Sequence, residues 1–188
     1  MPRVLALLFL GSLGLVLPAG AVAETSPTGG VQFPDDAPIV APGSKATLLP
    51  DGTAAAPADA PPQVQSAIFA ANQLLDKPYR YGGGHAKVED SGYDCSGTVS
   101  YALLAAKLIR TPMDSSSFMR WGLQGKGTWI TVYTNPGHAF AVIAGLRLDT
   151  STGGVVSRRI ARTAERGPRW RLALRSARGF RARHPLGF

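Results

Sequence analysis

The spacing of apolar residues changes along the chain and predicts a different structure for each part. Residues 4–17 form an apolar run that only Gly and Ser interrupt, and residues 24–62 show no sustained period. From residue 63 onward, apolar residues recur first at helical spacing and then in short strand-like runs. Helices followed by strands indicate an α+β domain.

Two helices are expected at the start of this domain. Apolar residues recur at i, i+4, i+7 and i+11 from residue 64, which predicts an amphipathic helix that begins after a Pro pair and ends near Asp76. A second helix is predicted after a glycine-rich loop, with one apolar stripe, and is expected to end at about Leu108. The stripe consists of Cys95, Val99, Ala102 and Ala106.

The remaining segments favour antiparallel strands. Residues 112–127 have the Ser and Gly content of a loop. Beyond them, β-type runs cover 129–133, 138–144 and 146–149, separated by turn residues, and two short strands are possible at 170–174 and 180–183. We therefore predict one domain over 63–188, with N-terminal helices packed on an antiparallel β-meander.

The N-terminal part is expected to direct export. A basic Arg3, the apolar run and a small-x-small site at Ala21–Ala23 predict a signal peptide over 1–23. The run is short for a membrane span, so the mature protein is expected to be secreted or periplasmic without a transmembrane segment. Residues 24–62 contain eight prolines and predict a disordered linker or a pro-segment.

Charge is concentrated toward the C-terminus. The formal net charge is +8. In an exported protein this favours anionic wall polymers as partners over nucleic acid, although a solubilising surface without a specific partner explains most of these residues equally well. Only Asp149 and Glu165 are acidic from residue 146 onward, against eleven arginines: Arg147, Arg158, Arg159, Arg162, Arg166, Arg169, Arg171, Arg175, Arg178, Arg181 and Arg183.

The single cysteine, Cys95, is the first candidate for chemistry. One cysteine in an exported protein cannot form an internal disulfide, and a lone thiol there is either buried as a small apolar residue or useful. Asp94 is placed to cap the helix that begins at Cys95, and a helix N-terminus favours the thiolate. Gly97 would allow a substrate or a strand to approach the thiol closely. The context favours a nucleophile.

Three histidines compete to be its base. His138 follows a Gly turn and begins an apolar strand, which would support it rigidly. His85 lies in the glycine-rich loop, where it would be solvated or contact substrate, and His184 lies near the C-terminus on the expected surface. We therefore predict His138 as the base.

A third residue is needed to orient the imidazole, and the hairpin after His138 supplies it. With a turn at 144–145 or at 145–146, strand alternation places Asp149 on the same face as His138 and Thr150 on the other. Asp149 is therefore predicted, with Thr150 in reserve because a bulge would exchange the two.

Three blocks of sequence resemble a known family. PYRYGGGH at 78–85, GYDCSG at 92–97 and GHAFAVIAG at 137–145 are similar, in combination, to the NlpC family of papain-like cell-wall cysteine peptidases. The resemblance covers about 63–149 and implies a papain-like NlpC-type fold, with the nucleophile at Cys95 and the base at His138. The family's third residue, commonly His, falls near Asp149 or Thr150.

The resemblance also implies a substrate. It suggests hydrolysis within the peptidoglycan stem peptide, at the bond between γ-D-glutamate and the diamino acid, without a cofactor. Three residues match positions that hold the substrate in this family, although a helix cap and core aromatics explain them equally well: Asp94, Tyr79 and Tyr81. Ser96, next to Cys95, is also predicted to bind substrate. The long segment 107–127 and the Arg-rich end depart from short members and could form cleft walls.

Two other functions stay open. A Cys and His pair also serves acyltransferases and amidases, which act on another envelope or protein substrate. A non-catalytic wall-binding module is the second alternative, although the intact order Cys95, His138, Asp149 argues against it. No metal site is predicted, because the Cys and His residues lack the close spacing of zinc ligands.

Overall fold

The computed structural model describes residues 39–151, 167–172 and 176–188. The chain divides into two compact units, Met1–Gly30 and Val31–Phe188, and the first lies wholly outside the described residues. The predicted signal peptide over 1–23 and the first part of the predicted linker, 24–38, therefore lie outside the described residues.

Both predicted helices are confirmed. Helix α1 spans Pro62–Asn72 and has Pro61 at its N-cap, where a missing N–H costs no helical hydrogen bond. Beyond the helix, hydrogen-bonded turns follow as far as Lys77. Helix α2 spans Cys95–Ala105, three residues shorter than predicted, because Lys107 has a φ of 57° that no helix accommodates.

A six-stranded antiparallel sheet forms the second layer. In the order β4-β9-β5-β6-β7-β8, its inner strands are β5 (Ile130–Asn135), β6 (His138–Ile143) and β7 (Leu146–Asp149), followed by β8 (Arg169–Leu172). Strands β5 to β8 form the predicted meander. At the other side, β9 (Arg181–His184) pairs with β5, and β4 (Leu123–Gln124) pairs with β9. The sheet is therefore a meander with the chain end added as a further strand, which periodicity alone does not reveal.

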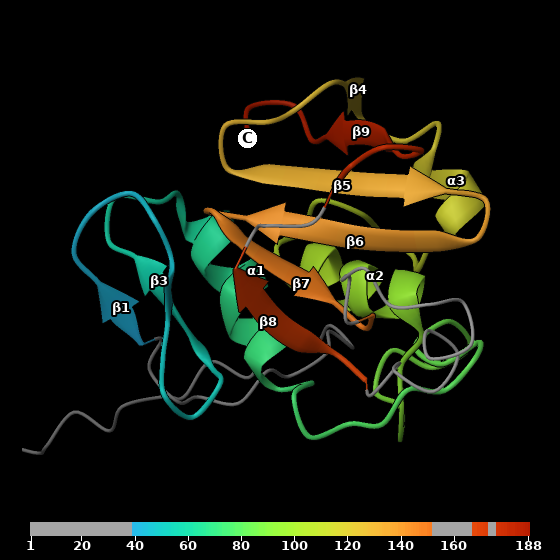
Figure 1. Cartoon of the computed structure of the whole chain (residues 1–188), viewed down its shortest axis with the longest axis horizontal. Helices are drawn as coiled ribbons and strands as arrows, with labels where there is room; N and C mark the ends of the chain where they lie inside the picture. Colours follow the sequence, from blue (N-terminus) through green and yellow to red (C-terminus); the bar gives the residue numbers. More distant parts are fainter. Residues whose placement is uncertain (1–38, 152–166, 173–175) are drawn as a thin grey trace, which may run out of the picture. The chain divides into compact units, whose positions relative to one another are not determined.

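The two faces of the sheet differ in their environment. Ala139, Ala141 and Ile143 on β6 point toward the helices and join one core with Val99 and Leu103 of α2. Figure 1 shows α1 and α2 behind the sheet, so one sheet face is covered by helices. Burial of each large apolar side chain there contributes about 1.5 to 3 kcal/mol. The α+β fold class is confirmed.

The prediction of a disordered linker is wrong for residues 39–62. These residues form a second, three-stranded sheet with strands β1 (Val40–Ala41), β2 (Thr47–Leu48) and β3 (Ala54–Pro57). The three alanines of β3 are 2% exposed or less, and the Asn72 side chain bonds both the N–H and the carbonyl of Ala54. Small alanines pack closely on α1 but give a weak hydrophobic signal, which is why composition suggested disorder.

The segment predicted as a loop, 112–127, contains two short elements. Helix α3 spans Ser115–Phe118, and its N-cap Asp114 accepts hydrogen bonds from Ser117. Strand β4 follows. Phe118 is fully buried against the main core and so anchors the segment.

Candidate active site

Cys95 is the first residue of α2. The preceding Asp94 has an extended backbone and its carboxylate accepts a 2.7 Å hydrogen bond from the Gly97 N–H, as expected of an N-cap. Cys95 is a free, partly exposed cysteine. The thiol is thus reachable from solvent at the positive end of a helix, where anions are favoured.

Asp94 also ties the glycine-rich loop to this helix. Its carboxylate accepts hydrogen bonds from the Gly82 N–H at 3.1 Å and the Ser96 hydroxyl at 3.1 Å. His85 Nε2 lies 3.0 Å from the same carboxylate. Burial disfavours the charged carboxylate, but the bonds from His85 and Gly97 outweigh it and lower the pKa of Asp94. Asp94 is therefore an ionised centre that joins the loop to the helix.

The lack of a side chain at Gly97 lets the backbone of the glycine-rich loop pack directly against α2. The place where a side chain would begin at Gly97 is occupied by the carbonyl of Gly83. The Gly83 carbonyl also accepts a hydrogen bond from the Asp94 N–H at 3.2 Å. The glycine fixes the loop beside Cys95, whereas the sequence suggested an approaching substrate or strand.

His138 stands at the start of β6 and faces Cys95. Its Nε2 donates to Asp149 Oδ1 at 2.9 Å, and the ring also hydrogen-bonds the Cys95 side chain. With Nε2 directed at the carboxylate, Nδ1 is the nitrogen left for the thiol. Burial opposes the charged ring, but the bonds to Asp149 and Cys95 outweigh it and raise the pKa of His138 to about 9. The raised pKa favours the charged form of the ring near neutral pH.

The hairpin register explains why Asp149 meets His138. Ile143 pairs with Leu146, so the turn consists of residues 144 and 145, as in the first of the two predicted registers. Asp149 is 1% exposed and its Oδ1 also accepts hydrogen bonds from the backbone and hydroxyl of Ser151. Thr150 is fully buried, and its hydroxyl has no hydrogen-bond partner among the described residues. The geometry therefore favours Asp149 over Thr150.

Cys95 opens into a cavity of about 430 Å³. All four residues predicted to contact substrate line it, although they differ in exposure. Tyr81 is 91% exposed at the rim, whereas Asp94 and Ser96 are buried in the wall. The cavity is bounded by Tyr79, Tyr81, Gly82, His85, Asp94, Cys95, Ser96, Asp114, Ser115, Ser116, Pro136 and Gly137.

Part of the cavity wall consists of residues that the sequence did not single out. Asp114, Ser115 and Ser116 lie at the start of α3, within the segment expected to form cleft walls. The Ser115 hydroxyl donates to the carbonyl of Pro136, in the turn before His138. An Asp followed by a Ser run is an N-cap signal that could have placed a helix start here.

Within residues 39–151, 167–172 and 176–188, no group of three or more His, Cys, Asp or Glu is arranged to hold a metal ion. In the same ranges, no helix is long and apolar enough to cross a membrane.

Comparisons with known proteins give a distant structural likeness. No family model matches the sequence, and no curated protein matches it. Among solved structures, the peptidoglycan hydrolase RipB from Mycobacterium tuberculosis is similar at a TM-score of 0.49 and 16% identity. The match covers 67% of this chain and 66% of that chain, slightly under two thirds of the solved chain. At this distance, the chemistry has to be argued from residues of this chain.

Proposed function

We propose that the protein is a cysteine peptidase that hydrolyses peptidoglycan stem peptides. The supporting observation is the chain of contacts from the Cys95 thiol to His138 and from His138 to the buried Asp149. The thiol lies at a helix N-terminus and lines an open cavity. A nucleophile, a base and a group that orients the base are the parts that acyl transfer requires.

The proposed reaction begins with the thiolate and imidazolium pair. The Cys95 sulfur attacks the carbonyl carbon of the scissile bond, and backbone N–H groups at the start of α2 stabilise the resulting oxyanion. His138 then gives its proton to the leaving amine as the C–N bond breaks, which leaves a thioester on Cys95. A water molecule that transfers its proton to His138 then attacks the thioester, and the C–S bond breaks, which releases the new carboxyl group and regenerates the thiolate and imidazolium pair.

Asp149 has an indirect role in this proposal. Its carboxylate accepts the hydrogen bond from the Nε2–H group, so it fixes the ring orientation that directs Nδ1 to the sulfur. Ser151 in turn holds the Asp149 carboxylate, and Arg147 Nε lies 3.4 Å from its other oxygen. These contacts keep the carboxylate in place while the ring changes charge.

The substrate follows from the motif resemblance at 78–85, 92–97 and 137–145. It suggests the bond between γ-D-glutamate and the diamino acid. The cavity supports a peptide substrate, because carboxylate and hydroxyl groups line it and an exposed tyrosine lies at its rim. An exported protein would meet this substrate outside the cytoplasm, so a secreted or periplasmic location is part of the proposal.

The test is digestion of purified peptidoglycan by the mature protein in ¹⁸O-labelled water. Mass spectrometry of the soluble fragments should show one ¹⁸O atom at a new stem-peptide carboxylate, which identifies both the bond and hydrolysis. Products joined to an added amine without ¹⁸O would support the acyltransferase alternative instead. No new fragment with the wild-type protein would refute the peptidoglycan hydrolase proposal.

A further inference from the structure

A second cavity lies on β9, where β4 ends at the edge of the sheet. It has a volume of about 500 Å³, within the range of small-molecule sites. Strand β4 pairs only with Arg183 and His184, the last two residues of β9, and so leaves Arg181 without a β4 partner. The cavity is lined there by Gln124, Gly125, Phe180, Arg181, Ala182 and Arg183.

Two arginines line this cavity, and they differ in how they are held. Arg183 donates from Nε to the carbonyl of Trp121 and from Nη2 to that of Gly122, both at 2.6 Å, so its guanidinium is fixed. Arg181 is exposed, and its side chain has no hydrogen-bond or ion-pair partner among the described residues. The N–H groups of Arg181 are therefore available to a ligand.

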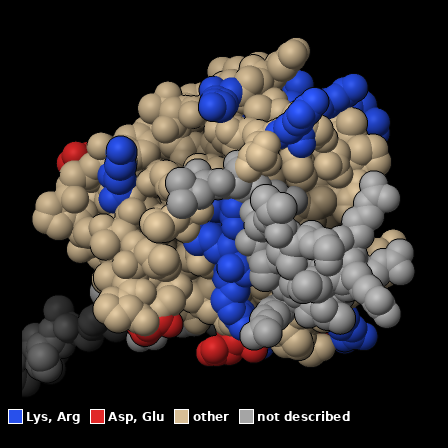
Figure 2. Space-filling model, in the orientation of Figure 1, with Lys and Arg blue, Asp and Glu red and all other residues tan. Residues whose placement is uncertain are grey.

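No acidic residue balances this charge nearby. None of the described lining residues is acidic. The sequence has no Asp or Glu between Asp114 and Asp149, a stretch that includes α3, β4, β5 and β6, and none from residue 167 to the end. Figure 2 shows Lys and Arg side chains, and no acidic ones, on the part of this face where Figure 1 places β4 and β9. A cavity in such a surface attracts anions.

The cavity lies close to the catalytic residues. The ring of its wall residue Phe180 has its centroid 6.2 Å from that of His138. Arg181 pairs with Thr134 of β5, whose hydroxyl donates to the carbonyl of Ser115 in the wall of the catalytic cavity. Strand β9 is two strands from β6, so their backbones are about 10 Å apart. A short peptide, at about 3.3 to 3.6 Å per residue, can reach from one site to the other.

We propose that this cavity is a substrate subsite, in which Arg181 binds a carboxylate of the stem peptide near the bond that Cys95 attacks. The inference rests on the proposed peptidoglycan function and names a group that the substrate must carry. A γ-glutamyl bond leaves the α-carboxylate of the same glutamate free, and a tripeptide that ends at the diamino acid has a carboxylate on the leaving side. A guanidinium binds either one through two parallel N–H groups.

The test measures binding by calorimetry with the inactive Cys95→Ala mature chain, so that binding is measured separately from cleavage. The probe is a stem tripeptide that ends at the diamino acid. Two further forms are amidated, one at the α-carboxylate of the glutamate and one at the C-terminal carboxylate. The free acid should bind, and one amidated form should bind about tenfold or more weakly. The form that loses affinity identifies the carboxylate that Arg181 binds.

Variants of Arg181 locate the site. Arg181→Glu should weaken binding of the free acid about tenfold or more and should remove the preference for the free acid over the amidated form. Arg181→Lys keeps the charge but loses the planar fork, so its loss should be smaller. The matched control is Arg110→Glu, which reverses an exposed charge beyond the C-terminal end of α2, the end away from Cys95. It should weaken binding by less than about twofold.

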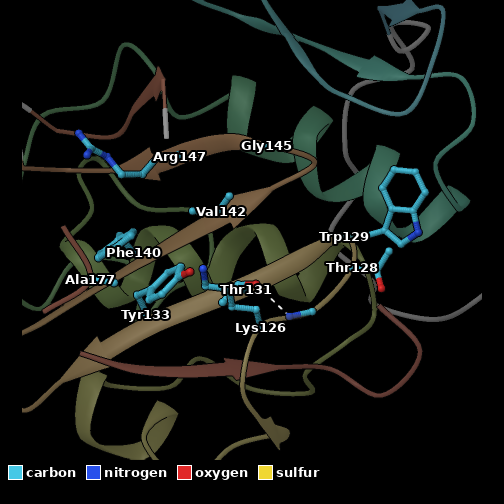
Figure 3. A pocket seen from close by; sticks show the side chains of 11 residues that line it. Lys126, Thr128, Trp129, Thr131, Tyr133, Phe140, Val142, Gly145, Arg147 and Ala177 are labelled. Atoms are coloured by element: carbon cyan, nitrogen blue, oxygen red, sulfur yellow. Dashed lines mark hydrogen bonds between the residues drawn. The ribbon is translucent and has the colours of Figure 1, made fainter. Parts of the chain in front are cut away.

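A nearer control is Lys126→Glu. Lys126 lines a different hollow together with Tyr133, on the sheet face opposite to Arg181, because Arg181 pairs with Thr134 and successive strand residues alternate between faces. Figure 3 shows this hollow, and its dashed line is the hydrogen bond from the Gly127 N–H to β5 that holds the loop of Lys126. Lys126→Glu should weaken binding by less than about threefold.

Circular dichroism should show that all these variants keep the fold, because Arg181 has no described partner to lose. Equal weakening by Arg181→Glu, Lys126→Glu and Arg110→Glu would show non-specific charge attraction and overturn the proposal. Equal binding of the free acid and both amidated forms, or no binding of the free acid, would also overturn it. Failure of the proposed function has a different result: the wild-type protein would leave the bound tripeptide uncut.

Discussion

Two histidine–aspartate pairs lie near Cys95, and they differ in whether the histidine ring also contacts the thiol. His138 donates Nε2 to Asp149, and its other nitrogen faces the thiol. His85 directs Nε2 at Asp94 as well, but the same nitrogen lies 3.2 Å from Ser96 Oγ. The distances within the two pairs, 2.9 and 3.0 Å, are nearly equal. A short contact to a carboxylate therefore does not identify the base.

Burial and support separate the two pairs. The Asp149 side chain is fully buried, and that of His138 is 12% exposed, against 10% for Asp94 and 25% for His85. His138 begins a strand in the middle of the sheet, whereas His85 lies in a loop. The first pair is therefore the better supported of the two and is the one that transfers protons in our proposal, whereas the second joins the loop to the helix. Substitutions should separate these roles.

The largest difference is expected between the two histidines. His138→Ala should lower kcat/KM on stem-peptide fragments by at least about 1,000-fold, because the thiol loses its base and the amine its proton donor. His85→Ala, the matched control, should cost about tenfold or less, since Asp94 keeps its bonds to Gly82 and Gly97. Equal losses in steady-state kinetics would mean that the two pairs were assigned wrongly.

A smaller loss is expected at the residue that orients the base. Asp149→Asn keeps the shape but removes the charge that stabilises the imidazolium, and kcat should fall by about 100-fold. Thr150→Val is the control, because the Thr150 hydroxyl makes no hydrogen bond among the described residues. A larger fall of kcat in Thr150→Val than in Asp149→Asn would reverse the choice between them.

The pH dependence should also distinguish the pairs. The pKa of His138 is raised to about 9, so kcat/KM should fall as pH rises through about 9 and the imidazolium is lost. The raised pKa of His138 also stabilises the folded protein. This stabilisation is complete below the ordinary histidine pKa near 6.5 and is lost as the pH rises to about 9.

Asp149→Asn is the sharper form of this test. It should move the alkaline limb of the kcat/KM profile to lower pH, because the carboxylate no longer raises the pKa of His138. His85→Ala should leave the limb in place. A limb that moves with His85→Ala and stays with Asp149→Asn would contradict the assignment.

The smallest effect concerns stability at the second pair. Asp94→Ala removes the cap of α2 and the acceptor for the Gly82 loop, which should lower the free energy of unfolding by about 1 to 2 kcal/mol. His85→Gln keeps a side-chain donor and should change it by less than about 0.5 kcal/mol. Urea denaturation followed by tryptophan fluorescence measures both, and a reversed order would show that His85 holds the loop more strongly than Asp94 does.

The parts of the site that depend on neighbours in sequence were predictable. Asp94 caps the helix that begins at the next residue, so the position of Cys95 followed from local rules. Asp149 lies eleven residues after His138, but a short hairpin with strict alternation is nearly as local, and both registers gave the same face.

The parts that depend on contacts between distant segments were not predictable. The pairing of β9 with β5 joins residues about fifty positions apart and gives no periodic signal. The alanine strand β3 is buried between β1 and β2 and against α1, which are contacts that its own sequence does not reveal. From its sequence neighbours, His85 was expected to be solvated or to contact substrate. Nothing near it in the sequence shows that its loop folds back onto Asp94.

The most direct test of the central claim compares the mature wild-type protein with Cys95→Ala on purified stem-peptide fragments. Mass spectrometry of the products should show cleavage by the wild type and a loss of at least about 1,000-fold in the variant. A brief reaction quenched in acid should also show a thioester adduct on the peptide that contains Cys95. Full activity of Cys95→Ala, or an adduct on another residue, would contradict the account.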